Sequence, residues 1–221
     1  ASFAEVENFY DENMSLIRIK LNPAISPAAN AQKYYKDYQK AKNAEHILTE
    51  QIEKGRSELE YIDSVLDTVS RAESERELAQ IREELTEQGY LRKQKGKQRP
   101  QAALPPLEFT SSDGFKILVG RNNTQNDKLT LKIANKNDMW LHTKDIHGSH
   151  TVVFAEGREI SDTAILEAAQ LAAYYSKARE SSQVPVDYTL VRYVSKPSGA
   201  RPGMVIYVNN KTVYVTPKGN V

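Results

Sequence analysis

Between residues 31 and 69, mostly apolar positions recur with alternating spacings of three and four. They are Ala31, Tyr34, Tyr38, Ala41, Glu45, Leu48, Ile52, Gly55, Leu59, Ile62, Leu66 and Val69. This spacing is typical of the a/d seam of a coiled coil. Gly55 could instead mark a turn between two helices, but the seam keeps its phase through it. We therefore predict one long helix over about residues 26–71, with Ser26 as its N-cap and Pro27 in its first turn.

A helix this long with an apolar seam needs a partner. The next segment, about residues 74–88, has a stripe of Leu78, Ile81 and Leu85 before a stop at Gly89, which predicts a second, shorter helix. It is far too short to cover the seam. We expect the chain to be a fragment whose seam pairs with an upstream helix or with a second copy of itself.

The segments on either side of the helices predict a fold of the α+β class. Alternation over residues 16–23 predicts a strand, with a partner strand within residues 6–13. With the helices, this small β element makes a first region, residues 1–91. Residues 92–106 are basic and contain Gly and Pro, which predicts a linker that is either a plain tether or a tail attracting phosphates.

Residues 107–221 alternate strands with shorter helices and predict a compact mixed α+β domain. Strands are expected within 115–120, 138–143, 150–155 and 186–194, helices within 122–135 and 161–179, and a hairpin within 204–217. Ser161 or Asp162 is the expected cap of the 161–179 helix. Asn209 and Asn210 suit the tight turn of the hairpin.

Composition removes several classes of site. The chain has no Cys, which excludes disulfides, a thiolate nucleophile and a zinc–thiolate site. No apolar run approaches the roughly 20 residues that span a bilayer, and no signal peptide is visible. The first region is acidic, whereas the linker and the second domain are basic, which hints at a polyanionic partner for the second domain.

Residues 139–150, MWLHTKDIHGSH, contain the only Trp and three of the four His. His142, His147 and His150 could suggest a metal triad, but Asp145 is the only nearby acid and no zinc-type spacing is present. Ser149 could act as a nucleophile, but no recognisable elbow surrounds it. We therefore expect no metal, no cofactor and no catalytic residue.

Two interpretations of this motif stay open. Trp140 can simply be core, with Gly148 needed for a tight turn. Alternatively, an aromatic ring, imidazoles and a cation form a surface that stacks on bases and donates to phosphates. The second interpretation makes candidate RNA contacts of Trp140, His142, Lys144, Ser149 and His150.

Two further loops carry cations and amides. Residues 120–127, GRNNTQND, join a strand to a helix, so Arg121, Asn122, Asn123 and Asn126 are either an anion site or ordinary helix capping. Residues 195–203, SKPSGARPG, place Lys196 and Arg201 in a loop that does not follow the P-loop pattern. We interpret both loops as RNA contacts.

Long motifs carry a resemblance to a known family. Residues 120–154, YYSKAR, VDYTLV and KPSGARPG are similar to the NFACT-R domain, and residues 21–44 with IREELTEQGYL resemble the coiled-coil middle region that precedes it. The positions that match best are Gly120, Arg121, Asn122, Asn123, Asn126, Asp127, Asp138, Trp140, His142, Gly148, Ser149, His150, Lys196, Pro197, Gly199, Ala200, Pro202 and Gly203. His147 departs from the family pattern, where Pro is common.

The resemblance implies a ribosome-associated quality-control factor in the cytoplasm. Such factors bind large ribosomal subunits obstructed by a nascent chain on peptidyl-tRNA, recruit tRNA and help add a C-terminal tail, alanine in bacteria. It implies rRNA and tRNA as partners, RNA binding by the NFACT-R domain, and no catalysis or membrane contact by this part of the protein. Because Gram-positive members were also described as fibronectin-binding proteins, a surface adhesin displayed by a non-classical route is the alternative.

Overall fold

The computed structural model describes residues 1–92 and 103–220. The chain divides into two compact units, Ala1–Ser57 and Glu58–Val221. Most of the predicted linker, residues 92–106, lies outside the described residues. The sequence predicts a first region that ends at residue 91. In the structure, the end of the long helix and the whole short helix belong instead to the same compact unit as the C-terminal domain.

The first unit pairs a β-hairpin with the start of the long helix. Strands β1 (Phe3–Glu7) and β2 (Leu16–Lys20) are antiparallel, with Phe3 opposite Lys20. The predicted strand at residues 16–23 is confirmed, but its partner lies earlier than predicted. Residues 8–15 form the connection instead, closed by a hydrogen bond of 2.9 Å from Asn8 N to Ser15 O.

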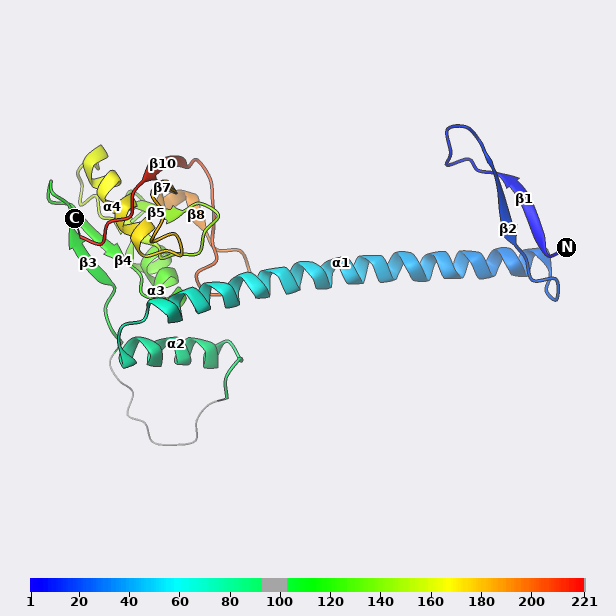
Figure 1. The fold of residues 1–221 in the computed structure, drawn as a ribbon, viewed down its shortest axis with the longest axis horizontal. Helices are drawn as coiled ribbons and strands as arrows, with labels where there is room; N and C mark the ends of the chain where they lie inside the picture. Colours follow the sequence, from blue (N-terminus) through cyan, green and yellow to red (C-terminus); the bar gives the residue numbers. More distant parts are fainter. Residues whose placement is uncertain (93–102, 221) are drawn as a thin grey trace. The chain divides into compact units, whose positions relative to one another are not determined.

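Helix α1 (Pro27–Arg71) runs without interruption through Gly55, which confirms the prediction of a single long helix (Figure 1). Ser26 Oγ accepts a hydrogen bond from the Ala29 N–H at 3.1 Å, so the predicted N-cap is present. Asn30 is buried and its amide donates to the carbonyl of Asn22, which fixes the chain entering the helix.

The second unit contains the last turns of α1 and helix α2 (Glu75–Glu87). Ser74 Oγ accepts from the Glu77 N–H, and Glu77 Oε2 accepts from the Glu73 N–H at 2.9 Å, a reciprocal capping arrangement. Tyr61, Val65 and Ile81 are buried together between the two helices. The predicted second helix is therefore confirmed.

The unit also contains a six-stranded antiparallel sheet in the order β10-β7-β5-β6-β4-β3. Figure 1 labels most of its strands beside α4. The strands are β3 (Leu107–Thr110), β4 (Lys116–Val119), β5 (Met139–Thr143), β6 (Thr151–Val153), β7 (Val184–Leu190) and β10 (Lys211–Val215). Together with the helices it makes the mixed α+β fold that the sequence predicted.

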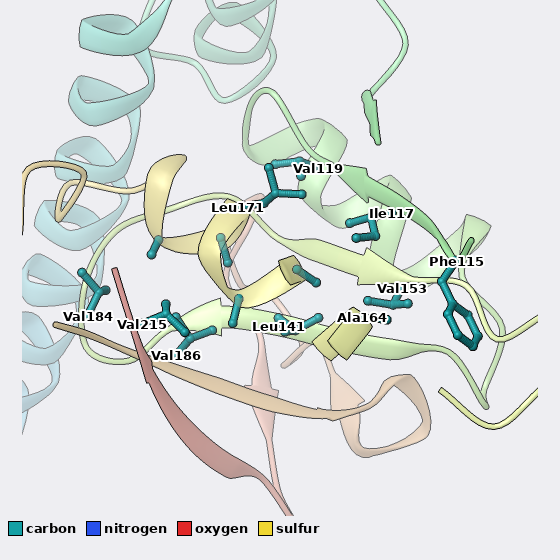
Figure 2. Close-up of a cluster of buried hydrophobic side chains, with 14 of the residues drawn as sticks. Phe115, Ile117, Val119, Leu141, Val153, Ala164, Leu171, Val184, Val186 and Val215 are labelled. Carbon is teal, nitrogen blue, oxygen red and sulfur yellow. The ribbon is translucent and has the colours of Figure 1, made fainter. Parts of the chain in front are cut away.

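Helix α4 (Asp162–Tyr174) covers one face of this sheet and is capped by Ser161, whose Oγ accepts from the Ala164 N–H at 3.0 Å. Its buried face is mostly alanine, which lets the helix approach the Val, Ile and Leu side chains of the strands closely (Figure 2). The close packing of these apolar groups is the main stabilisation of the domain.

The other face is covered by shorter elements. These are α3 (Asn123–Lys128) with the π-helical turn η1 (Leu129–Ile133) that continues it, η2 (Val191–Tyr193), and the two-stranded sheet of β8 (Val194–Ser195) and β9 (Ile206–Tyr207). They bury Leu118, Leu129, Trp140, Val152 and Val191 against the strands. The sheet is thus buried on both faces.

The hairpin predicted within residues 204–217 is wrong. Asn209 does adopt a positive φ of 56°, as the turn chemistry suggested. However, β9 pairs with β8, and β10 leaves it to pair with β7, with Val213 opposite Val186. At the edge of the large sheet, β10 has more partner residues to pair with than the two-residue β9 could provide. Val215 is also buried in this position.

Candidate nucleic-acid interface

Trp140 lies inside the domain. Its ring stacks on His142 with centroids 5.8 Å apart and an interplanar angle of 11°, and Tyr207 packs at 4.8 Å. His150 meets it edge-on at 5.2 Å. Trp140 is 0% exposed, so neither face of its ring is free to stack on a base in this structure. The core interpretation of Trp140 is therefore the one that its surroundings favour.

The two histidines beside it are held neutral. Burial lowers the pKa of His142 to about 4 and the pKa of His150 to about 3, and the two rings are 5.5 Å apart. His150 Nδ1 is hydrogen-bonded to Thr130 Oγ1 at 2.8 Å. Neutral, enclosed imidazoles contribute no positive charge toward a phosphate at neutral pH.

The structure separates the groups that a metal or nucleophilic site would need. Within residues 1–92 and 103–220, no three His, Asp or Glu side chains lie close enough together to hold a metal ion. Ser149 is buried, and its Oγ accepts from Arg71 at 3.4 Å. The neighbouring His150 is directed at Thr130, so these two residues do not form a nucleophile–base pair.

The amides of the 120–127 loop act within the fold. Asn122 caps α3, with its Oδ1 accepting from the Gln125 N–H at 2.8 Å. Asn126 Oδ1 accepts from the His150 N–H at 3.1 Å, and Asn123 Nδ2 donates to Ser64 Oγ at 2.9 Å. All three Asn are buried, which favours the capping and packing interpretation over a free anion site.

The three predicted loops do converge, because side chains of the 120–127 loop contact the other two loops. Asp127 forms an ion pair with Lys196 and accepts from the Gly203 N–H at 3.0 Å. Asn126 connects the same loop to His150. The motif residues chosen from the sequence therefore lie close together in the fold. Most of their side chains, however, contact other parts of the protein instead of facing solvent.

Three of the four predicted phosphate-binding cations have internal partners. Arg121 forms an ion pair with Glu77 of α2 and donates to the Pro105 carbonyl at 2.9 Å. Lys196 is paired with Asp127. Arg201 donates to Gln88 Oε1 at 3.1 Å and lies over the Tyr90 ring. By contrast, Lys144 is exposed.

Sequence reasoning missed the residue that unites this region, Glu84 of α2. Glu84 is 3% exposed and accepts hydrogen bonds from the Tyr61 hydroxyl at 2.9 Å, the Thr124 N–H at 3.0 Å and the Thr124 hydroxyl at 3.1 Å. Burial and this carboxylate raise the pKa of Tyr61 well above its usual range. A weak signal was available, since Glu84 follows Ile81 on the apolar stripe of α2 at helical spacing.

A pocket of about 470 Å³ lies between α2, the last turn of α1 and the domain, and three arginines line it. Arg71 is paired with Asp67 at 2.9 Å, Arg121 is paired with Glu77, and Arg179 stacks on Tyr174. Two of the three arginines are thus paired with carboxylates, and Glu73 and Glu77 also line the pocket, so the pocket has no strong preference for an anion.

Family comparisons agree with this architecture. Residues 1–103 match the model of the NFACT N-terminal and middle domains, and residues 106–209 match the model described as the NFACT protein RNA binding domain. The second range contains α3, α4 and every strand of the large sheet except β10, so this α+β domain is of an RNA-binding class.

The chain is also similar to named proteins. The Rqc2 homolog RqcH of Bacillus subtilis is 50% identical over 217 residues, which are 97% of this chain and 38% of that protein. The Rqc2 homolog RqcH of Streptococcus suis is 43% identical over 98% of this chain and 38% of its own length.

A solved structure, the C-terminal part of the fibronectin/fibrinogen-binding protein from Streptococcus suis, superimposes with a TM-score of 0.80 at 44% identity. The superposition covers 86% of this chain and 77% of that one. The chain belongs to the NFACT family, and it spans about two-fifths of the length of the curated relatives it matches. Among the described helices, none is both long and apolar enough to cross a membrane.

Proposed function

We propose that this chain is the RNA-binding part of a ribosome-associated quality-control factor. The observation that carries the proposal is the match of residues 106–209 to an RNA-binding domain, within a fold shared with relatives over nearly the whole chain. Support comes from the composition, because the domain and the linker before it are net basic.

In finer terms, the whole protein binds obstructed large subunits and recruits tRNA for alanine tailing of stalled nascent chains, in the cytoplasm. The long helix serves as one arm of a coiled-coil stalk. The test is site-specific crosslinking from Lys144 and from the exposed seam residue Leu48, in the full-length protein, to purified obstructed large subunits. Crosslinks to rRNA or tRNA are expected. If subunits still bind the protein but no crosslinks form, this chain does not contact their RNA.

The domain acts by binding and not by catalysis. The packing of Ser149 and His150 against separate partners supports this. A panel of phosphoester substrates with Mg²⁺, Mn²⁺ or Zn²⁺ should show no turnover above the buffer rate. Turnover that is lost on replacing His150 with Gln would establish a hydrolase instead.

Fibronectin binding is a second candidate, favoured by the Streptococcus suis structure at 44% identity. The discriminating measurement has two parts, binding of the chain to immobilised fibronectin and surface labelling of intact cells alongside ribosome fractionation. Strong surface labelling without a ribosomal fraction would favour the adhesin. Co-sedimentation with large subunits would favour the quality-control factor.

A further inference from the structure

One exposed cationic surface of the domain lies outside the predicted loops. It is formed by Lys128, Lys132 and Lys136, on α3, on η1 and just after it, and by Arg192 on η2; we name it the lysine strip. All four side chains are exposed. Within the described ranges, none of them has a carboxylate within 4.0 Å.

Three of the four cations follow one another along the chain at spacings of four, and the fold adds Arg192 beside the last of them. Lys128 and Lys132 are four residues apart on one continuous helical segment, so they lie near one face about 6 Å apart along the axis. Lys136 follows in the connection to β5. Arg192 is held beside it, because its backbone N–H and its Nε both donate to the Lys136 carbonyl, at 3.3 and 3.2 Å.

The acidic residues nearest in sequence to the lysine strip do not neutralise it. Asp127 is paired with Lys196, and Asp138 is buried, accepting from the N–H groups of Asn135 and Ala155. Glu156 is an exposed acid on the turn after Ala155, and it forms no ion pair with the strip. The strip therefore has an uncompensated positive charge, unlike Arg121 and Lys196.

A helix dipole explains only part of this arrangement. Lys128 and Lys132 stand in the last turns of α3 and η1, where cations are favourable. Lys136 and Arg192 are outside both turns, so helix stability gives no reason for them. Tyr193, which follows Arg192 in the sequence, is 38% exposed and is the aromatic residue available near this end of the strip. Cations that follow a backbone, next to an aromatic ring, are the pattern of single-stranded RNA binding.

We propose that the lysine strip is the phosphate-binding surface of this domain, that it takes the backbone of single-stranded RNA, and that Tyr193 stacks on a base. The proposal rests on the proposed function, since it names the surface through which RNA is bound. The paired loop cations Arg121 and Arg201 then hold α2 on the domain, Lys196 ties its loop to Asp127 of α3, and none of the three contacts RNA directly.

The test compares three variants of the chain by fluorescence anisotropy with a labelled single-stranded RNA of about 20 nucleotides. The strip variant is K128Q/K132Q/K136Q. The charge-matched control, K177Q/K211Q/K218Q, removes three exposed lysines from other elements. The third variant, K128R/K132R/K136R, keeps the charge and tests whether the strip acts through charge.

We expect the strip variant to bind roughly 10-fold or more weakly, because three phosphate contacts are lost, and the slope of log K against log salt to fall in magnitude by about 2. The control and the Arg variant should bind like the parent. Replacing Tyr193 with Ala should weaken binding to single strands more than to a duplex.

The outcomes separate the two proposals. If the parent chain binds no RNA, the proposed function fails with the strip. If the parent binds but the strip variant and the control bind equally well, or if anionic lipid vesicles respond to the strip and RNA does not, RNA binding belongs to another surface. Circular dichroism melting of all variants checks that folding is unchanged.

Discussion

At the scale of single residues, the interior next to Trp140 holds ionisable groups that a core normally excludes. His142 and His150 lie 5.5 Å apart, and the groups facing them include Asp187, His147 and Lys196. Neutral imidazoles fit this space, whereas a protonated pair would place two like charges in a poorly solvated volume. The pair therefore makes the stability of the domain depend on pH.

The sign of that dependence follows from the pKa values. Between pH 6.5 and about 4, the unfolded chain binds protons at these histidines and the folded chain does not. The free energy of unfolding should thus be highest above pH 6.5 and fall as the pH drops toward 4. We expect a loss on the order of 1 kcal/mol per histidine at pH 5.5, measured by urea unfolding followed through Trp140 fluorescence.

Two variants check the assignment. His150→Gln should be less stable at pH 7.5 but lose less on going to pH 5.5. His46→Gln, at an exposed position of α1, should behave like the parent. An unchanged pH dependence in the His150 variant would locate the effect elsewhere.

Gly203 lies where its loop and the loop of Asn123 approach each other so closely that a side chain would not fit. Its φ is +79°, and a Cβ would lie 2.6 Å from Asn123 Oδ1 and 3.0 Å from Asn123 Cβ. Gly203→Ala should therefore lower the free energy of unfolding by about 2 to 3 kcal/mol. Gly199→Ala, with a φ of +76° in the same loop but open space around it, should lower it by about 1 kcal/mol. Equal effects in denaturant titrations would show that the contact with Asn123 is unimportant.

At the scale of elements, α2 is fastened to the domain by polar groups more than by apolar ones. Glu84, Glu77 and Gln88 on this helix bind Thr124, Arg121 and Arg201. Buried or half-buried partners of this kind are costly to leave unpaired.

Replacing Glu84 with Ala should destabilise the unit by about 2 to 4 kcal/mol, because the Tyr61 hydroxyl and the Thr124 N–H lose their acceptor. Glu84→Gln keeps an amide oxygen and should cost less. Glu83→Ala, at the exposed neighbouring position, is the control and should be nearly neutral in thermal unfolding. If Glu84→Ala left the free energy of unfolding unchanged, water would be replacing the carboxylate as hydrogen-bond acceptor at no cost in stability.

Gly55 is the weak point of α1. Nothing lies within 4 Å of a Cβ placed there, so Ala fits without strain. Gly55→Ala should stabilise the helix by about 1 kcal/mol and slow amide hydrogen exchange around residue 55 by several-fold. Faster exchange would indicate that the glycine conformation has a role in this helix.

At the scale of the whole molecule, most of the seam of α1 is exposed within the described part of the chain, although Ile62 packs against the cluster of Tyr61, Val65 and Ile81. Leu48, Ile52, Leu59 and Leu66 are all more than half exposed. Exposed apolar side chains at heptad spacing on one helix usually pack against a second helix. The coiled coil that the sequence indicates stays a prediction, and a second helix is needed to form it.

We expect the chain to self-associate through this seam in solution when no other helix is supplied. The variant L59E/L66E should shift sedimentation equilibrium toward monomer, because both exposed side chains would place like charges in the seam. The variant K36Q/N43E makes the same change in net charge on the predicted opposite face and should not. A parent chain that is monomeric at all concentrations would contradict self-association.

Local patterns in the sequence determined much of this protein. Periodicity predicted α1 and α2, and alternation predicted β2. Side-chain chemistry predicted a cap at Ser26 and another at Asn122 or Asn123, since each of these features depends on residues a few positions apart. The motifs also indicated the family and the residues that converge near Trp140. These features are fixed by short-range geometry, which a linear sequence records directly.

Only the tertiary structure decided what those residues contact. Arg121 could bind a phosphate or Glu77, Trp140 could stack on a base or on Tyr207, and β10 could pair with β9 or with β7. Each choice depends on which distant surface covers the residue. That covering pairs Arg121, Lys196 and Arg201 with partners inside the protein, whereas Lys144 and the cations of the lysine strip stay exposed.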